Sequence, residues 1–201
     1  MRVISGKARG TKLKTIDSIK TRPTLDRVKE SLFNIIQNEI ADKEVLDLFA
    51  GSGALGIEAL SRNAKSATFC DMSNDDVKVL KENLENTHLI NKAKIYNSDY
   101  KKCIKELKKE NNKFDLIFID PPYKMDLAVL SCEELIKSDV IKENCLIIIE
   151  TDEITRDMDE LIRLQNKLST KSLQIVDKRK YGRANLIFIR ITSLHYLEEI
   201  K

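Results

Sequence analysis

The sequence has few of the residues that build metal sites, disulfide frameworks or membrane spans. It contains four cysteines and two histidines in 201 residues, and successive cysteines lie 33, 29 and 13 positions apart. Without a CxxC pair or a Cys/His cluster, these cysteines are expected to be small apolar residues in a reducing compartment. The longest apolar runs, such as LIFI and CLIII, are far too short to cross a bilayer. The start MRVISGKARG has no apolar signal segment, so we expect a cytoplasmic protein with no metal and no membrane partner.

Prolines and glycines are also scarce, three and six respectively, and neither a linker nor an internal repeat is visible. Hydrophobic residues make up 42% and charged residues 33% of the chain, which is typical of a soluble globular protein. A chain of this length favours one domain with a small extension. We expect the extension at 1–42 and the domain at 43–201, and we expect a monomer.

Charge is unevenly distributed along the chain. The first 30 residues carry nine Lys and Arg against three acids, a net charge of +6, whereas the remaining 171 residues sum to −3. A basic arm on a near-neutral body favours a polyanionic partner, although a solvated lysine-rich terminus has the same composition. A second, smaller basic cluster is KRKYGR at 178–183.

The apolar pattern predicts alternating strands and helices. At the start, RVIS and TKLKT flank GKARG as a candidate hairpin, and a helix with Thr24 as its N-cap follows TRPT. Nearly all-apolar strands separated by helices indicate a parallel sheet covered on both faces. The expected strands are 44–49, 67–71, 93–97, 114–119 and 144–150, and the expected helices are 53–62, 74–87, 99–110, 126–137 and 157–167. SLQIVDKRK and ANLIFIRI, separated by YGR, predict a terminal antiparallel hairpin. This is the Rossmann-like α/β fold of class I methyltransferases, with a mostly parallel seven-stranded sheet.

A glycine-rich stretch, LDLFAGSGALG (46–56), follows the first of these strands and opens a helix. Gly51, Gly53 and Gly56 have the G-x-G-x-x-G spacing, which lets the backbone turn tightly and approach a ligand. In a dinucleotide site the loop would hold a pyrophosphate, and in an S-adenosylmethionine site it would lie under the adenosine. A glycine turn used only for close packing of strand and helix is the structural alternative.

Two acids follow the next strands. Asp71, at the end of the second strand, can accept from both hydroxyls of a ribose and fits NAD and S-adenosylmethionine equally. Asp99, beyond the third strand, can accept from an adenine amine, and it can equally cap the following helix.

The fourth strand, DLIFI, ends in DPPY, which holds Asp120, Pro121 and Tyr123. Proline stops sheet pairing and stiffens the chain, although Asp-Pro-Pro is also an ordinary loop opener. At the carboxyl end of the sheet, the Asp120 carboxylate and the Pro121 carbonyl can accept both hydrogens of an exocyclic amine. They would turn its lone pair toward a methyl donor and stabilise the developing charge. Tyr123 would stack on the base, a contact worth roughly 1–3 kcal/mol, once that base has left its stack.

Together these motifs resemble a known family. RVISGKARGTKL, TRPTLDRVKESLFNII, LDLFAGSGALGIEALSR, FIDPPY and the late YG are similar to bacterial 16S rRNA guanine-N2 methyltransferases, which modify guanine 966 of small-subunit rRNA. The resemblance implies S-adenosylmethionine as the methyl donor and 16S rRNA in the small subunit or an assembly intermediate as the partner. Two positions depart from the family pattern: Ser73, where a second acid is common, and Arg183, where a smaller polar residue is expected.

The resemblance also assigns roles to individual residues. It implies that Asp120, Pro121 and Tyr123 hold the guanine. The cofactor would be lined or supported by Asp47, Phe49, Gly51, Gly53, Asp71, Asp99 and Thr24. The expected RNA contacts are Arg2, Lys7, Arg9, Arg22, Arg27 and Lys124.

Three alternative functions remain open from the sequence. DPPY serves amines generally, so a methyltransferase acting on DNA adenine N6 is one alternative. The glycine loop with Asp71 also permits an NAD(P)-dependent oxidoreductase. The third is an RNA-binding module without catalytic activity.

Overall fold

A computed structural model of the protein describes residues 1–16, 23–122 and 127–193; for residues 23–25 it describes the backbone alone. The chain divides into two compact units, Met1–Cys103 and Ile104–Lys201. Each unit is described separately below. Among the described helices, none is long and apolar enough to cross a membrane.

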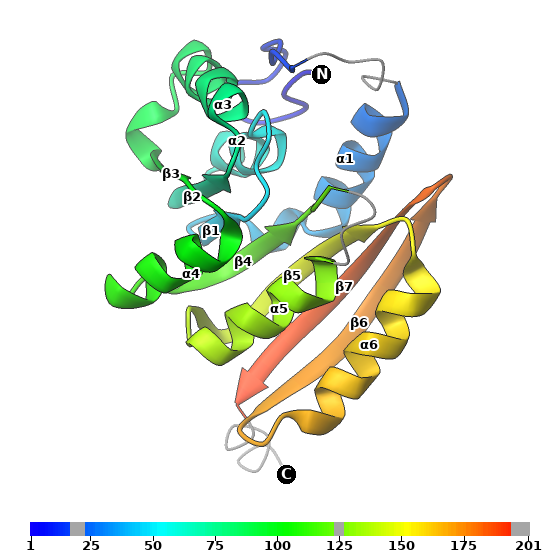
Figure 1. The fold of residues 1–201 in the computed structure, drawn as a ribbon. Helices are drawn as coiled ribbons and strands as arrows, with labels where there is room; N and C mark the ends of the chain where they lie inside the picture. Colours follow the sequence, from blue (N-terminus) through cyan, green and yellow to red (C-terminus); the bar gives the residue numbers. More distant parts are fainter. Residues whose placement is uncertain (17–22, 123–126, 194–201) are drawn as a thin grey trace. The chain divides into compact units, whose positions relative to one another are not determined.

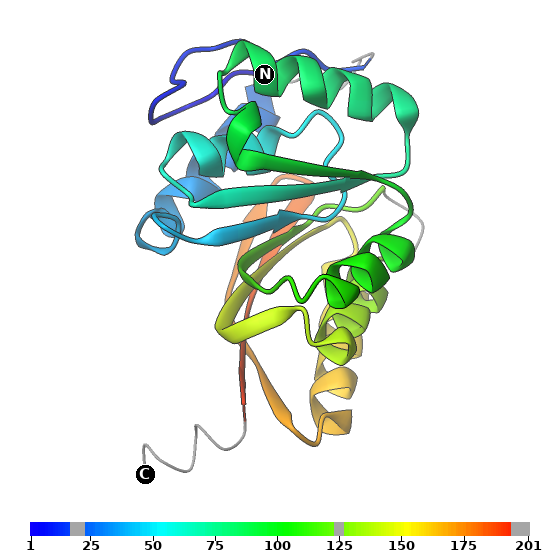
Figure 2. The ribbon, with the colours of Figure 1, turned by 90° about the vertical axis from the view of Figure 1, so that its left-hand side faces the viewer.

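The first unit alternates helices with three strands. Parallel pairing joins Val45 to Ala67 and Ala67 to Ala93, so these strands lie side by side in the order β3-β2-β1. Their elements are α1 (Pro23–Ile35), η1 (Gln37–Glu39), β1 (Glu44–Asp47), α2 (Ala54–Ser61), β2 (Ser66–Asp71), α3 (Asn74–Asn86), η2 (Ile90–Lys92), β3 (Ala93–Asn97) and the start of α4 (Tyr100–Lys109). Figure 2 shows α3 along these strands, with the N-terminal segment (residues 1–16) on the same side.

The second unit contains the more apolar strands. Its elements are β4 (Phe114–Ile119), α5 (Leu127–Ser138), β5 (Ile141–Thr151), α6 (Ile154–Lys167), β6 (Lys171–Tyr181) and β7 (Ala184–Ser193). In β5, residues 145–149 are all buried, as expected for a strand covered on both faces. Figures 1 and 2 show α5 and α6 on one face of these strands.

The order of the seven strands is β3-β2-β1 in the first unit and β4-β5-β7-β6 in the second. Pairing is parallel in β1–β2, β2–β3 and β4–β5, and antiparallel where β7 meets β5 and β6. The prediction of a mostly parallel α/β sheet with a C-terminal antiparallel hairpin is therefore confirmed. The boundary between an extension at 1–42 and a domain at 43–201 stays a prediction.

Two local predictions for the N-terminal region need correction. Helix α1 begins at Pro23, a residue favoured at the first helical position, so Thr24 lies inside the helix and is not its N-cap. The two predicted N-terminal strands reduce to a single antiparallel bridge between Arg2 and Lys12. The reason is that the Ile4 and Ser5 N–H groups donate to the Glu58 side chain on α2 rather than to a partner strand.

Candidate functional site

The loop between β1 and α2 is tied to the end of β2. The Ala50 N–H donates to the Cys70 carbonyl (2.9 Å), and the Gly51 N–H donates to Oδ2 of Asp71 (2.8 Å). Gly51 and Gly53 have φ angles of +50° and +80°, a region that side chains other than glycine rarely adopt. The loop therefore has a fixed conformation that depends on glycine and on the Asp71 carboxylate.

The three glycines of this loop have different surroundings. A Cβ built on Gly53 would lie 2.3 Å from Leu80 Cδ1, and one on Gly56 would lie 2.2 Å from Phe69 Cε1. These two glycines permit close packing of α2, which is the structural alternative considered from the sequence. A Cβ on Gly51 meets no atom of the described residues within 4 Å. Gly51 is therefore the glycine of the three with open space beside its backbone, where a ligand can approach.

Asp47 lies beneath the loop and is 1% exposed. Its Oδ2 accepts the Gly56 N–H at 3.0 Å, which fixes the first turn of α2. Burial raises the pKa of this carboxyl to about 7; the Gly56 hydrogen bond opposes the shift and the nearby Asp71 charge adds to it. This geometry supports the predicted role for Asp47, namely support of the loop from below.

Asp71 is half-buried at the end of β2. Its two carboxylate oxygens accept the Gly51 N–H (2.8 Å) and the Ser73 N–H (2.9 Å). Each oxygen has two acceptor positions, so the carboxylate retains capacity for ligand hydroxyls. Ser73, where the family often has a second acid, caps α3: its hydroxyl accepts the Asp76 N–H at 3.2 Å. Helix capping explains the serine at this position.

Asp99 begins α4. Its Oδ1 accepts the N–H groups of Lys101 (3.0 Å) and Lys102 (3.1 Å), so the capping role is confirmed. The adenine contact stays a prediction. The adjacent Tyr100 ring lies 5.7 Å from the Phe49 ring, and both residues are half-buried. Tyr100 was not predicted as a site residue, although its aromatic ring directly after Asp99 was the available indication.

In the second unit, Asp120 and Pro121 directly follow β4. Asp120 is half-buried, Pro121 is buried and Pro122 is exposed. Ile119, the last residue of β4, pairs with Ile149 of β5. The motif thus starts at the carboxyl end of a buried strand, as the sequence predicts. Four other predicted site groups, Arg22, Tyr123, Lys124 and the side chain of Thr24, lie outside the described part of the chain.

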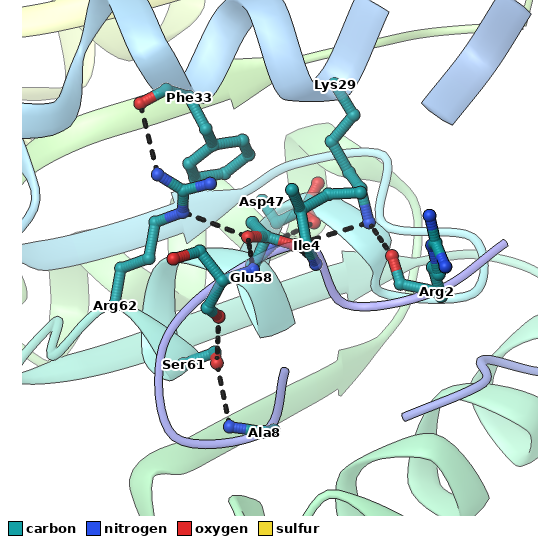
Figure 3. A network of polar contacts seen from close by, with 11 residues as sticks. Arg2, Ile4, Ala8, Lys29, Phe33, Asp47, Glu58, Ser61 and Arg62 are labelled. Atoms are coloured by element: carbon teal, nitrogen blue, oxygen red, sulfur yellow. Dashed lines mark hydrogen bonds and ion pairs between the residues drawn. The ribbon is translucent and has the colours of Figure 1, made fainter. Parts of the chain in front are cut away.

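A buried polar network holds the N-terminal segment on α2 (Figure 3). The Glu58 carboxylate, fully buried, accepts the N–H groups of Ile4 (2.8 Å) and Ser5 (3.0 Å). It also forms ion pairs with Lys29 (3.4 Å) and Arg62 (2.9 Å). Lys29 in turn donates to the carbonyl of Arg2 (2.7 Å), which brings α1 into the same cluster.

One turn further along α2, Ser61 fixes the glycine-rich turn of the segment. Its hydroxyl accepts the Ala8 N–H (3.0 Å) and donates to the Ser5 carbonyl, and its backbone carbonyl accepts the Lys7 N–H (2.9 Å). Gly6 has φ +83°, and a Cβ there would lie 1.9 Å from the Ser61 carbonyl oxygen. The segment has a fixed path, and the Lys7 side chain is exposed on it.

The predicted RNA contacts within the described residues are exposed. Arg2, Lys7 and Arg9 project from the anchored segment, and Arg27 projects from α1. Sequence reasoning missed the residues that anchor the segment. Glu58, a charged residue inside the apolar stretch ALGIEAL, was the available indication. Desolvation lowers the pKa of Lys29 despite the neighbouring Glu58 charge, as expected for an ammonium that is 4% exposed.

The described residues contain no group of three His, Cys, Asp or Glu side chains placed to hold a metal ion. All four cysteines are buried and free. The candidate cofactor elements are thus the Gly51 loop, the Asp71 and Asp99 carboxylates, and the Phe49–Tyr100 pair, all in the first unit.

Comparison with known proteins yields consistent matches. The chain is 40% identical over 153 residues to "Ribosomal RNA small subunit methyltransferase D" of Haemophilus influenzae, covering 76% of this chain and 79% of that protein. It is 38% identical over 152 residues to the protein of the same name from Escherichia coli, covering 76% and 75%. The solved structure of yhhF from Escherichia coli matches with a TM-score of 0.74 and 30% identity, over 96% of this chain and 98% of that one.

The match to a family model extends further along the sequence than these alignments. Residues 1–190 match the family described as "Conserved hypothetical protein 95". That range includes the N-terminal segment, the glycine loop, the DPPY motif and most of β7. The chain therefore belongs to the Conserved hypothetical protein 95 family, which confirms the resemblance recognised in its sequence.

Proposed function

We propose that this protein methylates a guanine at N2, at position 966 of 16S rRNA in the small ribosomal subunit, with S-adenosylmethionine as methyl donor. The observation that carries the proposal is the start of the DPPY motif, with half-buried Asp120 and buried Pro121 directly after β4. Membership of a family whose relatives are named as small-subunit rRNA methyltransferases supports the coarser function, rRNA methylation.

The residues of the first unit fit an adenosine-containing cofactor. Open space beside Gly51 would admit a ligand to the backbone, and Asp71 at the end of β2 would accept from ribose hydroxyls. Phe49 and Tyr100 offer aromatic surface, and Asp99 offers an acceptor for the adenine amine. When bound, S-adenosylmethionine supplies an electrophilic methyl group on a sulfonium.

The residues after β4 act on the guanine amine. The N2 lone pair is delocalised into the base, so the amine is a weak nucleophile. The Asp120 carboxylate and the Pro121 carbonyl would accept its two hydrogens, orient the lone pair and stabilise the positive charge that develops on nitrogen. Tyr123 would stack on the base, which must be unstacked or single-stranded to enter.

The exposed cations of the anchored N-terminal segment would contact RNA phosphates. Arg2, Lys7 and Arg9 are held by a segment whose path is fixed before RNA binds, which lowers the ordering cost of association. Arg22, Arg27 and Lys124 would add further contacts. We also propose a cytoplasmic monomer that acts on small subunits or their assembly intermediates.

Substitution of Asp120 tests the proposal. Asp120→Ala should lower kcat for methyl transfer to rRNA at least 100-fold, because an electrostatic contact made at the reacting centre is typically worth that much. Binding of S-adenosylhomocysteine, measured by calorimetry, should stay within about twofold. Asp115→Asn, on strand β4 just before the motif and in an ion pair with Lys142, is the matched control and should keep normal turnover. Near-normal turnover by Asp120→Ala would refute the mechanism.

A further inference from the structure

The β6–β7 hairpin ends in a tip, residues 178–183, that is rich in exposed cations. Lys178, Arg179, Lys180 and Arg183 are all exposed, and the Tyr181 ring between them is half-buried. Asp177, the residue just before them on β6, forms an ion pair with Arg179 (2.9 Å), in which the arginine side chain is 54% exposed and the aspartate side chain 31% exposed. A pair so exposed adds little to stability, and Arg179 can readily exchange Asp177 for another anion.

The tip has a defined conformation. Strands β6 and β7 pair continuously from Lys171↔Ser193 to Tyr181↔Ala184, apart from one bulge between Ile175 and Asp177. Gly182, with φ +64°, permits the tight two-residue turn. The cations are thus presented by a paired ribbon and not by a loose loop, so little conformational entropy is lost when they bind.

Strand register places the tip at the same end of the second unit as Asp120. Ile119 of β4 pairs with Ile149, and Glu150 of β5 pairs with Leu186 of β7, which pairs in turn with Arg179. Asp120, the next residue after Ile119, is thus level with Arg179. Figure 1 shows the tip projecting past the end of β5 at this edge.

The spacing between Asp120 and the cations suits a nucleic-acid strand. From β4 to β6 there are three strand spacings of 4.7–4.9 Å, about 14 Å in total. A stacked strand rises 3.4 Å per nucleotide, so this span corresponds to roughly four nucleotides. Glu150, near the end of β5, and Asp152 and Glu153, which follow the strand, place acids at the same end, so phosphates would be drawn to the cations of the tip and not to β5.

We propose that the tip at residues 178–183 is a second RNA contact. It binds single-stranded rRNA a few nucleotides from the base held at Asp120. Cations interleaved with an aromatic ring are the usual means of binding a single strand without reading its sequence. This inference rests on the proposed function. The competing explanation is that lysines on the edge strand β6 merely prevent sheet-to-sheet association.

The test compares two variants with equal net charge. The first replaces four tip residues with alanine: Lys178→Ala, Arg179→Ala, Lys180→Ala and Arg183→Ala. The matched control replaces four exposed cations on α4 and α6 with alanine: Lys105→Ala, Lys108→Ala, Arg163→Ala and Lys167→Ala. The measured quantities are KM for rRNA as a function of salt, kcat at saturating rRNA, and binding of S-adenosylhomocysteine.

The tip variant should raise KM for rRNA at least tenfold at 0.15 M salt, with kcat and S-adenosylhomocysteine binding unchanged. The slope of log KM against log salt should fall by about two to three, because each single-strand phosphate contact contributes about 0.7. Equal KM values in the two variants would overturn the proposal. Self-association of the tip variant with an unchanged KM would assign the cations to edge protection instead. If the wild-type protein methylates no RNA, the proposed function fails, and filter binding of rRNA by the two variants then decides the hairpin contact separately.

Discussion

A methyl group added at Gly51 should impair cofactor binding without unfolding the protein. The left-handed φ of +50° costs alanine roughly 1–2 kcal/mol, a fraction of the roughly 5–15 kcal/mol that stabilises a typical domain. Within the described part of the chain, the new Cβ meets no atom within 4 Å, so packing there adds nothing to that cost. It occupies the open space that the cofactor would enter, and we expect Gly51→Ala to weaken S-adenosylhomocysteine binding at least tenfold, about 1.4 kcal/mol.

Gly56→Ala is the matched control. Its Cβ would lie 2.2 Å from Phe69 Cε1 in the core, and overpacking of this kind costs roughly 1–3 kcal/mol. Both variants should therefore lose a similar amount of unfolding free energy in urea, measured by circular dichroism. Calorimetric titration with S-adenosylhomocysteine should detect a large loss of affinity for Gly51→Ala alone. Normal affinity in Gly51→Ala, or an equal loss in both variants, would refute the assignment of Gly51 as the glycine beside the ligand.

Two further predictions concern buried acids. Glu58→Ala should lower the unfolding free energy by about 3–5 kcal/mol, because Lys29 loses its buried partner, and trypsin should cleave the N-terminal segment faster. Glu82→Ala on α3 breaks only the exposed ion pair with Lys14 of the same segment and should leave stability nearly unchanged, so equal losses in the two variants would contradict the argument. Because the Asp47 pKa is raised from 3.8 to about 7, the protonated carboxyl favours the fold, so its stabilising contribution is full below pH 4 and is lost as pH rises to 7. Asp47→Asn should remove this pH dependence, a change in unfolding free energy of at most about 4 kcal/mol, when urea unfolding is measured across the same pH range. An unchanged curve would show that Asp47 does not titrate there.

The elements that the sequence predicts well are those with a strong local pattern. Strand β4 was expected at 114–119 and occupies Phe114–Ile119, because apolar residues fill it and the DPP sequence ends it. Strand β5 begins earlier than predicted, at Ile141, because the polar residues 142–144 do not read as a buried strand. Helix α6 also begins earlier, at Ile154, directly after a turn in which the Thr151 hydroxyl accepts the Glu153 N–H.

The sequence names the candidate site residues, but the separate structural role of each one depends on three-dimensional packing. The glycine spacing identifies the loop, yet only three-dimensional packing separates Gly51, beside open space, from Gly56, against Phe69. The Glu58 anchor joins residues 53 and 54 positions apart, a contact that no local pattern encodes. For Asp99 the sequence left two roles open, and the hydrogen bonds to Lys101 and Lys102 establish one of them.

The central claim is the identity of the methylated atom. The protein and labelled S-adenosylmethionine would be incubated in parallel samples with unmodified small subunits, with naked 16S rRNA and with unmethylated DNA. Mass spectrometry would then identify the methylated nucleosides in each sample. We predict N2-methylguanosine at a single guanine in the rRNA samples. The comparison of subunits with naked RNA would show whether ribosomal proteins are needed. N6-methyladenine in DNA, or no transfer despite bound cofactor, would contradict this prediction.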